Sequence, residues 1–180
     1  MTMQFRNRVE AGQLLAKLLA NYANRADVLV LALPRGGVPV GYEVAQALHA
    51  PLDVFMVRKL GVPGHEELAL GAIASGGVRV LNEEVVEGLQ IPDEVIEAVA
   101  VQELRELERR ECAYRGDRPA PEAQGRTIIL VDDGIATGST MRAAVEALRQ
   151  LEAGRIVTEG SGASVADRYL SLLVEQTGVA

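Results

Sequence analysis

The hydrophobic and polar positions in the first third of the chain follow two different periods. Apolar residues recur at helical spacing over 9–22 and then run almost without interruption over 28–34, where VLVLALP leads into Arg-Gly-Gly. The first pattern predicts a helix, and the second predicts a fully buried strand that ends in a tight turn. A second helix is predicted over 39–49, and LDVFMVRKL predicts the next strand over 52–60.

The same alternation continues after a glycine-rich interruption. Residues 61–77 carry little periodicity, so they predict a long loop that runs into a short hairpin closed by VRVLN at 78–82. An apolar stripe and Glu/Arg pairs four residues apart predict one long helix over 92–114. A connector, a buried strand and a further helix are predicted over 118–125, 127–131 and 139–152.

This order of elements predicts an α/β fold with a doubly wound parallel sheet, because strands that alternate with helices are joined by right-handed crossovers. With 180 residues, 48% of them hydrophobic, the chain is expected to form a single domain over 1–180. Ligands of such sheets collect at the carboxyl ends of the strands. The turns at 34–37, 58–61 and 132–134 are therefore expected to face one crevice.

Charge and cysteine content exclude several classes of protein. A formal net charge of -7 argues against binding to nucleic acid or to an acidic membrane, which require a positive surface. The single cysteine, Cys112, falls near the apolar stripe of the predicted long helix and is expected to be a small buried side chain. It allows no intrachain disulfide, and no Cys/His cluster suggests zinc. The chain also lacks an apolar signal segment and a stretch long enough to span a bilayer, so a cytoplasmic location is expected.

The stretch TIILVDDGIATGST carries the clearest chemistry. Adjacent carboxylates, Asp132 and Asp133, end a buried strand, and a pair of like charges there requires a cation, a metal or hydroxyl donors such as a sugar diol. The following turn offers backbone N–H groups, hydroxyls and a helix start, which together suit a phosphate. Its residues are Gly134, Ala136, Thr137, Gly138, Ser139 and Thr140. The alternative is that Ser139 or Thr140 only caps the helix.

Three cations lie near the ends of two other predicted strands. A lone arginine after a strand is usually a solvated charge, but Arg35, Arg58 and Lys59 in an acidic protein favour an anionic ligand. For Arg35, the alternative is that only its backbone binds. Neither the P-loop nor the G-x-G-x-x-G fingerprint is present, because the first lacks its lysine and the second its central glycine.

Residues 128–140 closely resemble the phosphoribosyl diphosphate (PRPP) motif of the type I phosphoribosyltransferases. The LALPRGG segment at 31–37 resembles the pyrophosphate loop of that family, and VRKLG at 57–61 resembles the basic end of its next strand. The resemblance covers about residues 5–157 and is greatest for the uncharacterised members that contain LPRGG and RKxG. It implies transfer of ribose 5-phosphate from PRPP to a nitrogenous base, as in nucleotide salvage.

The resemblance also implies a role for each matching residue. The segment from Ala136 to Thr140 would hold the 5-phosphate, and Asp132 and Asp133 would bind the ribose hydroxyls and, through them and the pyrophosphate, Mg²⁺. Backbone groups of Arg35, Gly36 and Gly37 would face the pyrophosphate across a non-proline cis peptide. The implied catalytic residues are Asp132, Asp133, Arg58 and Lys59. The loop at 61–75 would be the lid, and a homodimer is expected.

Two departures from the family pattern leave alternatives open. Ala136 replaces the acid of the 6-oxopurine salvage enzymes, so hypoxanthine and guanine are less expected as acceptors and the base stays undetermined. After 155–157 the chain leaves the pattern: residues 158–180 read as an atypical tail with one helix near 165–176, and the next sheet edge is shortened, supplied by a partner or lost. A PRPP-sensing regulator and a catalytically incomplete fragment are the alternatives. His65, Glu66 and Glu67 are expected to be exposed.

Overall fold

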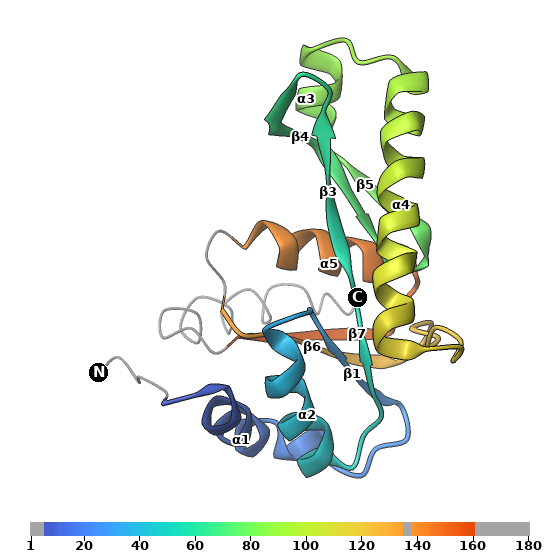
Figure 1. Cartoon of the computed structure of the whole chain (residues 1–180). Coiled ribbons are helices and arrows are strands. Elements are labelled where there is room, and N and C mark those ends of the chain that lie inside the picture. The colour runs from blue at the N-terminus through green and yellow to red at the C-terminus, as the bar shows by residue number, and fades with distance from the viewer. Residues whose placement is uncertain (1–5, 135–137, 161–180) are drawn as a thin grey trace, which may run out of the picture.

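The structure is a computed structural model that describes residues 6–134 and 138–160 of the chain (Figure 1). Its strands form two sheets. The parallel sheet has the order β2-β1-β6-β7 and the antiparallel sheet has the order β3-β4-β5. The strands are β1 (Val28–Ala32), β2 (Leu52–Val54), β3 (Val57–Val62), β4 (His65–Ala74), β5 (Val78–Leu81), β6 (Thr127–Asp132) and β7 (Arg155–Gly160).

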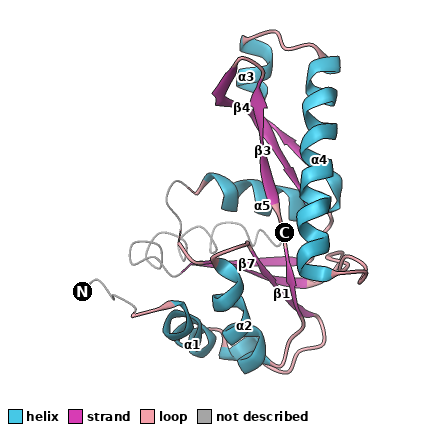
Figure 2. Cartoon of the chain, viewed as in Figure 1, coloured by secondary structure: helices cyan, strands magenta, loops and turns pink. Residues whose placement is uncertain are grey.

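Helices surround the parallel sheet and lie along the antiparallel one (Figure 2). They are α1 (Arg8–Leu18), α2 (Gly37–Leu48), α3 (Glu83–Gly88), α4 (Asp93–Arg115) and α5 (Ser139–Gln150), with short 3₁₀ turns at Ala20–Tyr22 and Ser75–Gly77. No helix in the described ranges is long and apolar enough to cross a bilayer.

The parallel sheet is buried on both faces, as its uninterrupted apolar strands predict. Val28 and Val30 of β1 pack into the core formed with α1 and α2. Leu29 and Leu31 point the other way, toward α5 and the antiparallel sheet. Successive strand residues face opposite sides, so one apolar run supplies both cores. The predicted α/β fold with a parallel sheet is confirmed.

The segment predicted as one strand over 52–60 belongs to two different sheets. The Phe55 backbone N–H still donates to the Ala32 carbonyl of β1 at 3.0 Å, whereas the Met56 N–H donates to the Ser75 hydroxyl at 2.7 Å. The hydrogen-bond partner therefore changes between these two residues. An unbroken apolar run gives no signal of such a change, which is why the prediction of a single strand was wrong.

The segment predicted as a loop over 61–77 is mainly the ten-residue strand β4, which pairs with β3 and β5. Its tight turn with β3 contains Gly64, whose φ of 79° favours glycine. The small residues of this segment give little of the alternation that marks a strand. Gly71 is one of them, and only glycine fits there, because a β-carbon would lie 2.1 Å from the Val80 carbonyl oxygen. The expected hairpin with VRVLN is confirmed, but the expected loop-like lid is not.

Residues 57–115, which we call the arm, extend away from the parallel sheet with α4 alongside β3 (Figure 1).

The buried face of α4 explains why the expectation for Cys112 was wrong. The apolar stripe continues from Ile96 through Leu107 to two charged residues, Glu111 and Arg115, both buried. Cys112 follows Glu111 and is exposed. The buried face of a helix is predicted from its apolar residues, and charged residues are normally assigned to the exposed face. Glu111 and Arg115 are buried because they are paired, and the sequence pattern does not show that pairing.

A buried polar cluster joins the arm to the parallel sheet. The Arg115 Nε donates to Asp53 Oδ1 at 3.0 Å, and its Nη2 donates to the Val54 carbonyl at 3.3 Å. Arg115 Nη1 also lies 3.6 Å from Glu111 Oε2, and the Ser75 hydroxyl donates to the other oxygen of Glu111. The two ends of the arm are thus held together at its base.

The carboxyl-terminal part of the described chain differs from the expected pattern. β7 pairs in parallel with β6 from Thr127 opposite Arg155 to Asp132 opposite Gly160, so the strand continues beyond the predicted point of departure at 157. The next sheet edge, expected to be shortened, supplied by a partner or lost, would follow β7 and lies outside the described residues, so that expectation stays a prediction. The helix predicted near 165–176 lies outside the described residues.

Candidate active site

The turns that follow β1 and β6 meet at the carboxyl edge of the parallel sheet. The two strands are direct neighbours, with Ala32 opposite Val131, so the turns begin side by side. A β-carbon on Gly36 would lie 1.9 Å from Asp133 Oδ2, and one on Gly37 would lie 2.7 Å from the Val131 carbonyl oxygen. Only glycine permits this approach, which brings the predicted pyrophosphate loop against the predicted diol-binding acids.

The turn after β1 has the backbone that the family resemblance implied. The peptide bond between Pro34 and Arg35 is cis, although the residue that follows it is not proline. The Gly37 N–H donates to the Leu33 carbonyl at 3.0 Å, and α2 starts at Gly37 without a side-chain cap. Arg35 is exposed, so its backbone rather than its side chain is fixed by the turn.

Asp132 and Asp133 are both partly buried, as expected for acids at the end of a buried strand. The Asp133 backbone N–H donates to Asp132 Oδ1 at 2.8 Å. Burial raises the pKa of Asp132 to about 6, the backbone hydrogen bond partly offsets this rise, and the negative charge of Asp133 adds to it. A negative charge on Asp132 beside Asp133 is therefore costly, and a cation or hydroxyl donor next to the two acids is favoured.

Arg8 supplies a cation to this pair, and sequence reasoning missed it. Its Nε and Nη2 donate to Asp133 Oδ2 at 2.8 and 2.6 Å. Arg8 is the first residue of α1, which packs on α2. No local pattern in the sequence could have found this contact, because 125 positions separate the two residues.

The start of α5 lies where the phosphate-binding turn was predicted. Gly138 precedes the helix with a φ of 73°, a left-handed conformation that favours glycine, and it makes no side-chain cap bond. The helix begins at Ser139, so the alternative in which Ser139 or Thr140 is the N-cap is wrong. Gly134 is exposed beside the acids, whereas the predicted ligands Ala136 and Thr137 lie outside the described residues.

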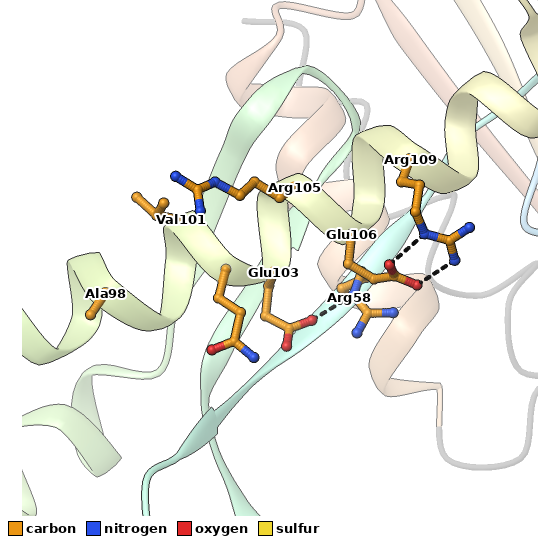
Figure 3. Close-up of a pocket in the computed structure, with 8 residues that line it drawn as sticks. Arg58, Ala98, Val101, Glu103, Arg105, Glu106 and Arg109 are labelled. Atoms are coloured by element: carbon orange, nitrogen blue, oxygen red, sulfur yellow. Dashed lines mark hydrogen bonds and ion pairs between the residues drawn. The ribbon is translucent and has the colours of Figure 1, made fainter.

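Arg58 and Lys59 do not face the same side. Both lie inside β3 rather than after its end, and the expectation that both share a crevice with the predicted phosphate turn was wrong for Arg58, whereas Lys59 lines a cavity with Ser139 and Thr140. Arg58 points to α4, where its Nε donates to Glu103 Oε2 at 2.5 Å beside the Glu106–Arg109 pair (Figure 3). Lys59 lines a cavity on the opposite face, because successive strand residues alternate.

The cavity beside Lys59 has a volume of about 850 Å³ and lies between the arm, α5 and β7. Ser139 and Thr140, at the start of α5, line it together with Lys59 and Thr158. Apolar side chains supply much of the remaining wall: Val57, Ala72, Val80, Met141, Val145 and Ile156. Charged side chains line it as well, namely Arg142, Glu146, Arg149 and Arg155, so the cavity combines an apolar wall with charged groups and suits a small polar organic ligand.

The described residues contain no group of three or more His, Cys, Asp or Glu side chains that could hold a metal. Asp132 and Asp133 offer carboxylate oxygens only. This donor set is too small for a dedicated all-protein metal cage. It fits Mg²⁺, which binds one or two carboxylates and takes its other ligands from phosphates and water.

Comparisons with known proteins identify the family. Residues 6–158 match the model of the phosphoribosyl transferase domain, and the chain belongs to this family. Two Mycobacterium tuberculosis proteins with the provisional name phosphoribosyl transferase are 50% identical to it over 153 residues. These residues make up 85% of this chain and 34% of each relative, so the chain spans about a third of the relatives' length.

A solved structure supports the fold. The crystal structure of the protein TT1426 from Thermus thermophilus is 42% identical in sequence, with a TM-score of 0.74, and the match covers 88% of this chain and 74% of that one. The expected relationship to the type I phosphoribosyltransferases and their mixed α/β fold is confirmed.

Proposed function

We propose that the protein transfers ribose 5-phosphate from PRPP to a nitrogen atom of a nucleobase-like molecule and releases pyrophosphate. One observation carries the proposal: the cis-peptide turn after β1 lies against the Asp133 carboxylate at the end of β6. This contact supports a site in which backbone N–H groups of the turn bind a phosphate and the neighbouring carboxylate accepts from a sugar diol. Membership of the phosphoribosyl transferase family supports the same reaction.

Each part of the site has a task in this proposal. The backbone of Arg35, Gly36 and Gly37 binds the pyrophosphate, while Asp132 and Asp133 accept hydrogen bonds from the ribose hydroxyls. The segment from Gly134 to Thr140 binds the 5-phosphate. Lys59 neutralises charge that develops on the leaving group, and Arg58 holds β3 against α4 through Glu103 so that Lys59 faces the cavity.

Mg²⁺ is proposed as the cofactor, bound through Asp132, Asp133 and the substrate's own oxygens. When bound, it supplies positive charge that stabilises the departing pyrophosphate. The raised pKa of Asp132 fits this role, because a cation or a diol beside the pair favours its ionised form.

The chemistry is a displacement at the anomeric carbon of the ribose. The nitrogen of the acceptor forms a bond to C1 as the bond from C1 to the pyrophosphate oxygen breaks, with inversion, and the acceptor then loses a proton. The protein contributes by fixing the phosphate, diol and pyrophosphate so that the acceptor lies in line. The cavity between the arm and α5 is proposed to hold the acceptor, with the apolar part of its wall limiting the access of water that would hydrolyse PRPP.

Calorimetric titration with PRPP in the presence of Mg²⁺ tests the site without a choice of base. The wild-type protein is expected to bind, and Asp133→Asn is expected to lose at least about tenfold in affinity because it removes a charged acceptor. Asp117→Asn, at an exposed position beyond α4, is the matched control and should bind like wild type. Equal affinity of wild type and Asp133→Asn would exclude the assigned site.

Turnover distinguishes the enzyme from a PRPP sensor and from an incomplete fragment. A panel of nucleobases with PRPP and Mg²⁺ is expected to give pyrophosphate release with at least one base. Binding of PRPP without release by any base would support the sensor instead, and no binding would support the fragment. Nucleotide salvage, a cytoplasmic location and a homodimer also stay predictions, the last of which sedimentation equilibrium would test.

A further inference from the structure

Arg8 is placed where it can serve a ligand as well as the acid it contacts. Both of its hydrogen bonds end on one oxygen, Asp133 Oδ2, at 2.8 and 2.6 Å. The same oxygen lies against Gly36 of the turn that contains the cis peptide. The guanidinium, the carboxylate and the backbone of the predicted pyrophosphate loop are therefore in consecutive contact.

The Asp133 carboxylate cannot serve Arg8 and a ribose diol equally well at this oxygen. A diol donates hydrogen bonds to the carboxylate, and two N–H groups of Arg8 already occupy Oδ2. When a ligand takes this oxygen, the guanidinium needs another acceptor. The oxygens of a pyrophosphate bound at the adjacent turn would be negatively charged and would accept two parallel N–H bonds, the arrangement that arginine favours.

The side chain of Arg8 is free to make this exchange. Its relative exposure is 58%, compared with 29% for Asp133, so little packing holds it in place. Its backbone is fixed as the first residue of α1, which Asn7 caps through a bond from the Glu10 N–H at 2.9 Å. A fixed backbone and an exposed side chain allow the guanidinium to move while its origin stays beside the site.

We propose that Arg8 pairs with Asp133 in the free protein and moves to the pyrophosphate group of PRPP when the ribose diol binds Asp133. This inference rests on the proposed function, since it assumes that PRPP is the ligand. Arg8 is then a ligand-binding residue supplied from outside the sequence motifs. Its pairing with Asp133 also offsets the repulsion between the two acids while the site is empty.

Three ligands separate this role from its alternatives. Wild type, Arg8→Gln and Arg8→Lys are titrated in Mg²⁺ with PRPP, ribose 5-phosphate and inorganic pyrophosphate. Arg8→Gln is expected to bind PRPP and pyrophosphate about tenfold or more weakly. It should bind ribose 5-phosphate as tightly as wild type or more tightly, because the competition for Asp133 is gone. Arg8→Lys, which keeps the charge without the planar fork, should be intermediate for PRPP.

Arg6→Gln is the matched control. Arg6 lies two positions earlier and pairs with Glu10 rather than with the site, at 3.0 Å. This variant removes the same charge and should bind all three ligands like wild type. If Arg6→Gln lost as much PRPP affinity as Arg8→Gln, the effect would come from the removal of a positive charge anywhere near the site, and the proposal would be overturned.

The remaining outcomes are distinct. Unchanged PRPP affinity in Arg8→Gln overturns the role of Arg8 and leaves the proposed function intact. Tighter binding of PRPP and ribose 5-phosphate by that variant means that Arg8 only competes with the substrate, which also overturns the proposal. Equally weaker binding of ribose 5-phosphate would make Arg8 a positioning residue for Asp133 instead, and the proposed move to pyrophosphate would be overturned. A wild-type protein that binds neither PRPP nor ribose 5-phosphate overturns the proposed function itself.

Discussion

The Asp133 carboxylate and the backbone of Gly36 are in direct contact across two neighbouring strands. A β-carbon on Gly36 would lie 1.9 Å from Asp133 Oδ2 and 2.1 Å from its Cγ. The acid that follows β6 therefore sets the shape of the turn that follows β1. A change in either turn is expected to alter the other.

Gly36→Ala is expected to weaken PRPP binding by at least about tenfold, because the added methyl group must displace the Asp133 carboxylate. The strain should also lower the free energy of unfolding by about 1–3 kcal/mol. Calorimetry and urea unfolding measure the two effects. Gly88→Ala, where a β-carbon would meet nothing within 4 Å, is the control: it should leave PRPP binding unchanged and should not lower the free energy of unfolding. Normal PRPP binding by Gly36→Ala would show that the two turns do not form one site.

Asp132→Asn is expected to stabilise the unliganded protein at pH 8 but not at pH 4. Burial raises the pKa of Asp132 from 3.8 to about 6, so the folded protein holds the proton more tightly than the unfolded chain does. Stability therefore falls as pH rises from about 4 to 6, and the asparagine variant avoids this loss.

The expected gain of Asp132→Asn at pH 8 is about 1 kcal/mol, less than the full pKa shift implies, because solvent reaches part of the carboxyl group. Urea unfolding at the two pH values measures it, with Asp117→Asn as the exposed control. Parallel pH profiles for wild type and Asp132→Asn would contradict the raised pKa. PRPP binding should be weakened in the same variant, so stability and function would change in opposite directions.

Lys59→Ala and Arg58→Ala remove the same charge from neighbouring positions and are expected to differ in effect. Lys59→Ala should weaken PRPP binding and leave stability almost unchanged, because Lys59 lines the cavity beside α5. Arg58→Ala should lower the free energy of unfolding by about 1–2 kcal/mol, because it leaves the partly buried Glu103 without this partner. It should change PRPP affinity less than Lys59→Ala does.

The same titration and unfolding experiments test this pair. A larger loss of PRPP affinity in Arg58→Ala than in Lys59→Ala would contradict the assignment of the two faces of β3. Equal losses would mean that both side chains reach the ligand.

Arg115→Met is expected to lower the free energy of unfolding by about 3 kcal/mol, because it leaves the partly buried Asp53 and the buried Glu111 without their cation. Arg110→Met changes an exposed arginine of the same helix and is the control, with an expected effect below about 1 kcal/mol. Urea unfolding monitored by circular dichroism measures both. Similar stabilities for the two variants would show that the cluster does not hold the arm.

The sequence predicted the parts of the fold and site that local patterns encode. The apolar run before Asp132 identifies a buried strand, and the small residues after Asp133 identify the turn that leads into α5. Arg8 could not be predicted, since its contact with Asp133 depends on the packing of α1 on α2. Which face Arg58 and Lys59 point to depends on how β3 pairs within its sheet. The sequence did not show this pairing, because the chain passes from one sheet to the other between Phe55 and Met56.

The ion pair between Asp53 and Arg115 joins the point where the chain leaves the parallel sheet to the end of α4, where the chain returns toward that sheet. Insertions or deletions within β3 to α4 would alter the roof over the cavity without shifting the register of the four parallel strands. A single contiguous segment can therefore vary in length while the turns after β1 and β6 keep their positions relative to each other.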